Sequence, residues 1–368
     1  MSSIWGQNIK ISIFGESHGK AIGVVIDGLP PGEFIDFDQI NSQMSKRKPG
    51  RSALTTSRNE SDKPEIVSGV LNGKTTGSPV CAIIKNEDFN PSDYKENEFI
   101  LRPGHADFTS TVRYNGFSDL SGGGHLSGRL TAPIVFAGTI CKGILERSGV
   151  YIGAHLSQIG DISDEPFDEI NVDRQILEKL SKKSFSVINE EASLKMKQKI
   201  LEIKNQGNSI GGTIECAVVG LSEGIGDPIF DNIESKISSM IFAVPGVKGL
   251  EFGSGFNCSS MLGSEHNDEF IIQNGKVKTK TNNHSGILGG ISTGMPIIFK
   301  VAFKPTASIS KPQRTVNLKE KTECEVSFGG RHDTCIAVRA VPVVESAGAI
   351  AILDLMIPNL NRKINHEV

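Results

Sequence analysis

Histidine recurs in short turns of this sequence, together with glycine and a cation. GESHG (15–19) frames His18 with two glycines, and RPGHAD (102–107) places His105 close after Arg102. Glycine lets the backbone approach a ligand closely, and histidine gains or loses a proton near neutral pH. Arginine binds carboxylate or phosphate through two parallel hydrogen bonds. This combination indicates a site for a small polyanionic ligand.

GESHGK matches neither of two familiar catalytic patterns. A nucleophile elbow needs its serine on a strand-to-helix turn, whereas this chain runs on into another expected strand. A phosphate loop is one residue longer and has Ser or Thr after its lysine, but Ala21 follows Lys20 here. A strand-ending turn with a surface histidine is the alternative to a functional role.

Two further stretches are candidates for anion contacts. Residues 46–63 (KRKPGRSALTTSRNESDK) are densely basic, which fits either a lid over an anion or a solvated loop. Residues 121–133 (SGGGHLSGRLTAP) set three glycines before an expected helix. Free N–H groups and the helix dipole attract anions at such a place, and a flexible hinge is the alternative.

The C-terminal part of the chain adds KPTASI (304–309) and GGRHDTCIAVRAVP (329–342). His332 and Cys335 have the spacing of metal ligands, but no second pair completes a site, so we expect no metal.

The composition describes a globular chain of nearly balanced charge. Its 368 residues carry 39 Lys+Arg and 42 Asp+Glu, which argues against a general nucleic-acid binder. The six cysteines form no CxxC pair, so we expect a reducing compartment. No secretory signal is evident, and the apolar stretch 132–141 is shorter than the roughly 20 residues of a membrane span. We therefore expect a soluble cytoplasmic protein with no membrane partner.

Two halves of the sequence resemble each other. Residues 15–32 align with 207–224, and residues 68–79 align with 285–296. Residues 37–45 align with 230–238, and the weakest match pairs 129–140 with 339–350. Chance similarity of glycine-rich turns is the alternative. We predict one domain over 1–368, with half-repeats at about 1–150 and 207–368 and a connecting region at 151–206.

The same elements are expected in each half. An apolar strand is followed by a helix that begins at Asp36 or Asp38 in the first half and at Asp231 in the second. The closing helices, 131–147 and 341–357, are apolar nearly all round, which is typical of buried helices. A further helix is expected near 190–207. We predict an α+β fold, a β-α-β sandwich with helices buried between antiparallel sheets and an internal pseudo-twofold repeat.

These motifs, read in order from about residue 5 to residue 357, resemble the chorismate synthase family. The resemblance implies a trans-1,4 elimination of phosphate from 5-enolpyruvylshikimate 3-phosphate to give chorismate, the last step of the shikimate pathway. It also implies reduced FMN as cofactor with no net redox change, a β-α-β sandwich and a homotetramer.

The resemblance also implies roles for individual residues. His18 would act as general acid near the departing phosphate, His105 would protonate or hydrogen-bond the reduced flavin, and Asp333 would act at flavin N5. Ser17 and Ser127 would assist by hydrogen bonding. The substrate-binding residues would be Arg47, Arg102, Arg129 and Arg339. The flavin-binding residues would be His125, Leu126, Ser127, Gly289, Lys304, Pro305, Thr306, Ala307, Ser308 and Arg331.

The sequence departs from the family pattern at several positions. His125 and Leu126 stand where the family usually has Arg-Ser, Ala53 replaces an arginine, and Thr334 replaces a proline. These changes bear on contacts with the flavin and with an anion. One alternative is an enzyme that also reduces its flavin with NADPH, with Arg47 as a contact; otherwise a separate flavin reductase would be a partner. Another is a non-catalytic homologue that binds anions or flavin.

Overall fold

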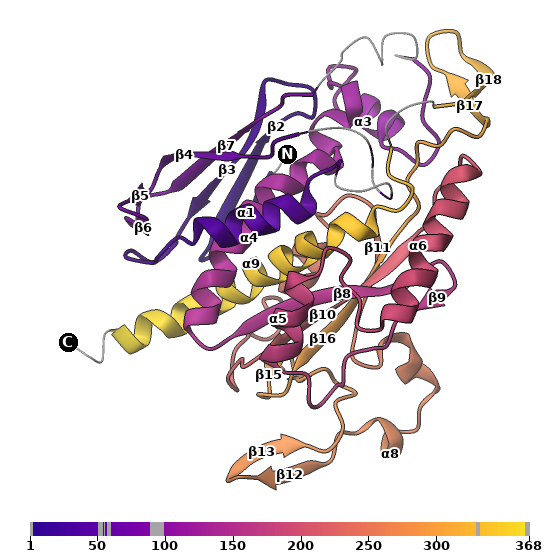
Figure 1. Cartoon of the computed structure of the whole chain (residues 1–368). Helices are drawn as coiled ribbons and strands as arrows, with labels where there is room; N and C mark the ends of the chain where they lie inside the picture. The colour runs from indigo at the N-terminus through magenta and orange to yellow at the C-terminus, as the bar shows by residue number, and fades with distance from the viewer. Residues whose placement is uncertain are drawn as a thin grey trace.

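The computed structural model describes residues 3–50, 54, 56, 60–88, 99–328 and 332–364. Two five-stranded antiparallel sheets dominate it (Figure 1). The first has the order β1-β2-β3-β7-β4, with β1 (Ile4–Trp5), β2 (Lys10–Gly15), β3 (Ala21–Asp27), β7 (Val80–Lys85) and β4 (Pro64–Ser68). The second has the order β11-β16-β10-β8-β9, with β11 (Val247–Phe252), β16 (Ile297–Phe303), β10 (Gly212–Val219), β8 (Tyr151–Ile159) and β9 (Ile162–Ser163).

Long apolar helices fill the space between the sheets (Figure 1). Helix α4 (Thr131–Arg147) packs along α9 (Ala337–Ile364), α4 also contacts β3 of the first sheet, and α9 contacts β8 and β10 of the second. The helical segment Ser121–Arg147, which ends with α4, and Ala337–Leu360 of α9 are long and apolar enough to cross a membrane, yet the apolar stretch of each is almost entirely buried within the protein. They are core helices, and the expected antiparallel sheets are confirmed.

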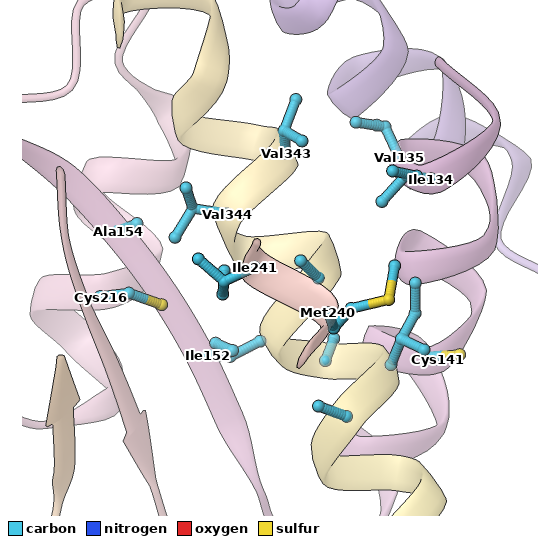
Figure 2. Close-up of a cluster of buried hydrophobic side chains, with 14 of the residues drawn as sticks. Ile134, Val135, Cys141, Ile152, Ala154, Cys216, Met240, Ile241, Val343 and Val344 are labelled. Atoms are coloured by element: carbon cyan, nitrogen blue, oxygen red, sulfur yellow. The ribbon is translucent and has the colours of Figure 1, made fainter. Parts of the chain in front are cut away.

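Shorter helices complete the core. Helices α1 (Phe37–Arg47) and α7 (Ile233–Ile241) pack against α9. Figure 2 shows side chains from α4, α7 and α9 meeting those of β8 and β10, among them Cys141, Met240 and Ile152. Because such interiors are packed as densely as organic crystals, this core fixes how the loops above it are placed.

Sequence signals located several helix ends correctly. Asp36 caps α1 by accepting from Gln39 N–H at 2.9 Å, and the helix expected near 190–207 is α6 (Glu190–Asn205). The cap expected at Asp231 is wrong, since Asn232 accepts from Ser235 N–H at 2.6 Å. Asn232 is the extended residue directly before the first helical one, which is where a cap must lie.

The remaining elements are peripheral, except that residues 151–206 contribute β8 to the interior of the second sheet. The other helices are α3 (Asp107–Arg113), α5 (Arg174–Lys182) and α8 (Gly263–His266), with 3₁₀ turns η1 (Ser121–Leu126), η2 (Gly128–Leu130) and η3 (Gly255–Ser260). The two-stranded hairpins are β5 (Val70–Leu71) with β6 (Lys74–Thr75), β12 (Phe270–Gln273) with β13 (Lys276–Thr279), β14 (Ile287–Leu288) with β15 (Ile291–Ser292), and β17 (Gln313–Asn317) with β18 (Thr322–Val326).

Gly138 lets α4 and α9 approach each other closely. A Cβ at this position would lie 2.2 Å from the Cβ of Ser346 and 2.4 Å from its Cα. Gly138→Ala is therefore expected to lower the free energy of unfolding by about 1–3 kcal/mol through overpacking. Gly143→Ala in the same helix meets only ordinary contacts, so it should be neutral or stabilise by up to about 1 kcal/mol. Urea unfolding of both variants measures the difference; equal effects would contradict the close approach.

Candidate active site

Loops at one end of the helical layer enclose a cavity of about 1720 Å³. Such a volume exceeds the roughly 300–1,000 Å³ that holds one drug-sized ligand. The cavity gathers most of the residues singled out in the sequence. These are His18, Arg47, Arg102, His105, His125, Leu126, Ser127, Arg129, Lys304, Pro305, Thr306, Ala307, Ser308, Asp333 and Arg339.

Two of the expected residues, Ser17 and Gly289, are described by the structure and do not line the cavity. Ser17 is fully buried next to His18. Gly289 lies near the start of α7, since the carbonyl of the next residue, Gly290, accepts from the N–H of Ile233. The cavity is lined instead by Phe242, just after the other end of α7. Arg331, like Arg51 and Ala53 of the basic stretch, lies outside the described residues.

The three consecutive glycines lie between the two histidines. Gly122, Gly123 and Gly124 all have positive φ, at 59°, 89° and 52°, a region that side chains with a Cβ rarely adopt. A Cβ on Gly122 would lie 2.0 Å from Cε1 of His18, and one on Gly123 would lie 3.2 Å from Cε1 of His105. The loop is thus a spacer that only glycine can form, against which both imidazoles rest.

His105 is held by Asp107, which also binds Arg102. Nδ1 of His105 lies 2.7 Å from Oδ1 of Asp107, and Arg102 donates from Nε to Oδ2 at 2.8 Å and from Nη2 to Oδ1 at 2.6 Å. Burial raises the pKa of Asp107, but His105 and Arg102 more than reverse this and hold the pKa well below its usual range. The ionised carboxylate keeps a proton on Nδ1, which leaves Nε2 as the nitrogen that exchanges protons.

Asp107→Asn is expected to lower kcat by about 10²-fold, the low end of what positioned acid–base groups contribute. The amide no longer keeps the proton on Nδ1 of His105, so the imidazole loses its fixed tautomer. Steady-state rates measure the loss. In a His105→Ala background the same substitution should cause little further loss, and full additivity of the two losses would contradict the coupling.

Arg47 and Arg129 share one buried carboxylate. Arg47 Nη1 lies 2.6 Å from Oδ2 of Asp62, and Arg129 binds Oδ1 of the same group. Arg129 also donates to Asn86 Oδ1 at 3.0 Å, and its Nη2 lies 3.5 Å from Glu60. Burial lowers the pKa of Arg47 to about 10, although Asp62 opposes this, so the guanidinium is still charged at neutral pH. Burial raises the pKa of Asp62, but the two arginines lower it below its ordinary value.

Glu60, Asp62 and Asn86 were not assigned roles from the sequence. The sequence did contain a signal, the acidic pair in NESDK at the end of the basic stretch. Buried arginines require buried partners, so these two carboxylates were candidates for that role.

Asp333 and Arg339 form a second ion pair on the cavity wall. Nε of Arg339 lies 3.2 Å and 3.1 Å from the two carboxylate oxygens, and Nη2 also contacts Oδ2. Thr56 N–H donates to Oδ1 of Asp333 at 3.0 Å, and Arg339 Nη1 donates to the carbonyl of Arg47 at 3.1 Å. The carboxylate is therefore fixed in place by three directional contacts.

His332 and Cys335, which flank Asp333 in the sequence, are in environments that favour their neutral forms. Burial, with Arg102 nearby, lowers the pKa of His332, and burial raises the pKa of the Cys335 thiol to about 12. Metal binding by cysteine needs a thiolate, which this environment disfavours. Within the described residues, no three His, Cys, Asp or Glu are grouped to hold a metal.

The lining of the cavity suits a flat cofactor with an anionic tail. Ile134, Phe242 and Leu126 are among its apolar lining residues. Lys304 donates to the carbonyl of Gly104 at 2.6 Å, and its pKa is lowered by burial and by neighbouring Lys248. An apolar surface and two adjacent cations fit a flavin and its phosphate. Sequence reasoning missed Phe242 and Lys248, which lie in no recognisable motif.

Comparisons with known proteins cover almost the whole chain. The family model described as chorismate synthase matches residues 9–357. The chorismate synthase of Dehalococcoides mccartyi is 43% identical over 96% of this chain and 96% of its own length. That of Pyrococcus abyssi is 44% identical over 95% and 96%. A crystal structure of chorismate synthase matches with a TM-score of 0.76 at 26% identity, covering 98% of this chain and 99% of the other.

The fold and the cavity define an enzyme that binds a polyanionic substrate beside a larger ligand. The chain belongs to the chorismate synthase family, a family of soluble enzymes. Its activity is that of a phosphate lyase, which eliminates phosphate from 5-enolpyruvylshikimate 3-phosphate and yields chorismate in the shikimate pathway of aromatic amino acid biosynthesis. The family uses reduced FMN.

Proposed function

We propose that different residues of this cavity carry out different parts of the 1,4-elimination. The observation that carries the proposal is the glycine spacer. His18 and His105 rest on adjacent glycines of this spacer, and both line the same cavity. Asp333 lines the same cavity. Two acid–base groups and a fixed carboxylate suit a reaction in which a phosphate leaves and a proton is removed.

His18 acts as the general acid near the departing phosphate. A phosphate leaves more easily when its developing charge is met by a proton or a cation. Ser17 and Ser127 assist by hydrogen bonding, and Ser127 lines the cavity directly. Arg47, Arg102, Arg129 and Arg339 provide the positive field for the phosphate and two carboxylates of the substrate. Because each already binds an aspartate, they act as a fixed field that costs little rearrangement during the reaction.

His105 acts on the flavin and Asp333 accepts the proton near flavin N5. Reduced FMN, when bound, supplies electron density to the breaking C–O bond and recovers it, with no net redox change. The chain would hold it with Leu126, Ser127, Lys304, Pro305, Thr306, Ala307 and Ser308, which line the cavity, and with Arg331.

The proposed roles of the histidines are tested by anaerobic assay of purified protein with photoreduced FMN and substrate. Chorismate absorbance and phosphate release should appear together. His18→Ala and His105→Ala should each lower the single-turnover rate by about 10²–10⁴-fold while far-UV circular dichroism is unchanged. Wild-type rates in either variant would remove that residue from the mechanism.

NADPH is a proposed source of electrons, with Arg47 as a contact, and a separate flavin reductase is the other source. Oxidation of NADPH by the pure protein with FMN, followed at 340 nm, decides between them.

We also propose that the chain forms a homotetramer in the cytoplasm. Phe270, Ile272 and Val277 of the β12–β13 hairpin are 62%, 73% and 56% exposed, which is typical of surfaces that a second copy covers. The six cysteines are all free thiols, as expected in a reducing compartment. Light scattering on the purified protein measures the assembly, and a monomer would contradict it.

The chain is proposed to be one domain made of two related halves. The first sheet is built from residues before 90 and is followed by α4, whereas the second sheet is followed by α9. The first half thus supplies one sheet and one long buried helix. Residues 207–368 supply the other long helix and the strands β10, β11 and β16, to which the connecting region adds β8 and β9.

A further inference from the structure

The imidazole of His125 connects three segments that meet at the active site. Its Nδ1 lies 2.8 Å from the carbonyl oxygen of Gly15, and its Nε2 lies 2.8 Å from Oγ of Ser3. A carbonyl oxygen only accepts, so Nδ1 carries a proton and donates to Gly15. In the neutral ring, Nε2 then accepts from the Ser3 hydroxyl. Both ring nitrogens are therefore engaged by protein groups.

A second hydrogen bond joins the same two segments, with the donor now on the His18 turn. The N–H of Ser17 donates to the carbonyl of Gly124 at 3.1 Å. The glycine spacer and the turn that carries His18 are thus joined by two hydrogen bonds with donor and acceptor reversed. Asn86 also binds this turn, donating to the carbonyls of Glu16 at 2.9 Å and Gly19 at 2.7 Å, but the His125 bond ties the turn to residues 122–125 beside the Ser17 bond.

His18 depends on this attachment because it rests on the spacer itself. A Cβ on Gly122 would lie only 2.0 Å from Cε1 of His18. A misplacement of a catalytic group by about 1 Å can cost roughly 10²-fold in rate. The turn from Gly15 to His18 must therefore keep its distance from residues 122–125.

We propose that His125 is a positioning residue whose Nδ1–H bond to Gly15 sets the placement of His18 against the glycine spacer. In this chain the ring acts through the His18 turn, in place of the flavin contact that the family pattern implies at position 125. The proposal rests on the proposed role of His18 in the reaction.

Two amide substitutions separate the two ends of the imidazole. In His125→Asn the side-chain amide takes the place of Nδ1 and still donates toward Gly15, so we expect kcat within about threefold of wild type. In His125→Gln the amide takes the place of Nε2 and reaches toward Ser3, so we expect kcat to fall by about 10- to 10²-fold, as in His125→Ala. Ser3→Ala, which leaves the Gly15 bond, should lower kcat less than His125→Ala.

The affinity for FMN distinguishes positioning from direct flavin binding. Fluorescence titration with FMN in the presence of substrate should give dissociation constants within about twofold of wild type for all His125 variants. A tenfold weaker FMN affinity, with normal kcat at saturating flavin, would overturn the proposal. Equal losses of kcat in the Asn and Gln variants would also overturn it. This comparison needs no folded alanine variant.

A double substitution tests the dependence on His18. If His125 acts through His18, His18→Ala with His125→Ala should be no slower than His18→Ala alone. Multiplied losses would overturn the proposal. If His18→Ala alone keeps the wild-type rate, the proposed role of His18 fails, whereas the Asn and Gln comparison still reports whether the Gly15 bond matters.

Discussion

Replacement of Asp62 by alanine is expected to lower the free energy of unfolding by about 3–5 kcal/mol. This carboxylate binds both Arg47 and Arg129, and the side chains of all three residues are at most 4% exposed. Without it, two buried guanidinium groups lose their shared counter-ion, and Glu60 is the one carboxylate left beside Arg129 among the residues that the structure describes. Chemical unfolding of the wild type and the variant measures the change, and a loss below 1 kcal/mol would contradict the shared role.

The same carboxylate predicts how stability depends on acid. The pKa of Asp62 is lower in the folded protein than its ordinary 3.8. Its contribution is therefore fully present above the unfolded pKa and is lost as the pH falls through the folded pKa. Asp62→Asn keeps the shape but not the charge, so its stability should decline less steeply below about pH 4 than that of the wild type. Parallel pH curves for the two proteins would argue against this.

Replacement of Asp333 by asparagine is expected to slow turnover by about 10²–10⁴-fold with the fold intact. The amide retains hydrogen-bonding atoms for Thr56 and Arg339, which bind the carboxylate in the wild type. It has no basic oxygen to accept a proton, so the chemical step suffers. Single-turnover kinetics with photoreduced FMN measures the loss.

Asp333→Ala provides the matched comparison. It should be as slow as the asparagine variant but less stable, because Arg339 then loses its partner on the cavity wall. An asparagine variant with near wild-type rates, beside a slow alanine variant, would show that Asp333 only holds Arg339 and removes no proton.

Local patterns predicted the helices well. The closing helix expected at 131–147 is α4 with the same bounds, because the segment is mostly apolar and is followed by Gly149. The second closing helix extends beyond the expected 341–357 to Ala337–Ile364, and Pro342 and Pro358 lie inside it. Proline normally favours a helix end, so packing against α4 and the second sheet outweighs that local preference.

The active site was predictable only in part. Residue types and motifs located the histidines and arginines, because glycine, cations and histidine recur together. The carboxylates that bind these arginines were not identified as partners, since Asp62 reaches Arg129 from a distant part of the chain. Position 125 shows a further limit: the sequence reveals a departure from the family pattern, but the carbonyl that the new side chain binds depends on how the loops fold together.

The glycine spacer has a consequence for how this enzyme can vary. Residues 122 and 123 separate two imidazoles by peptide backbone alone, so the interval between them is set by covalent bond lengths and not by adjustable side chains. Any mutation that adds a Cβ at residue 122 must push His18 aside. In a saturation mutagenesis experiment this position should accept glycine only. The separation of the two imidazoles is thus fixed at positions where no larger side chain fits.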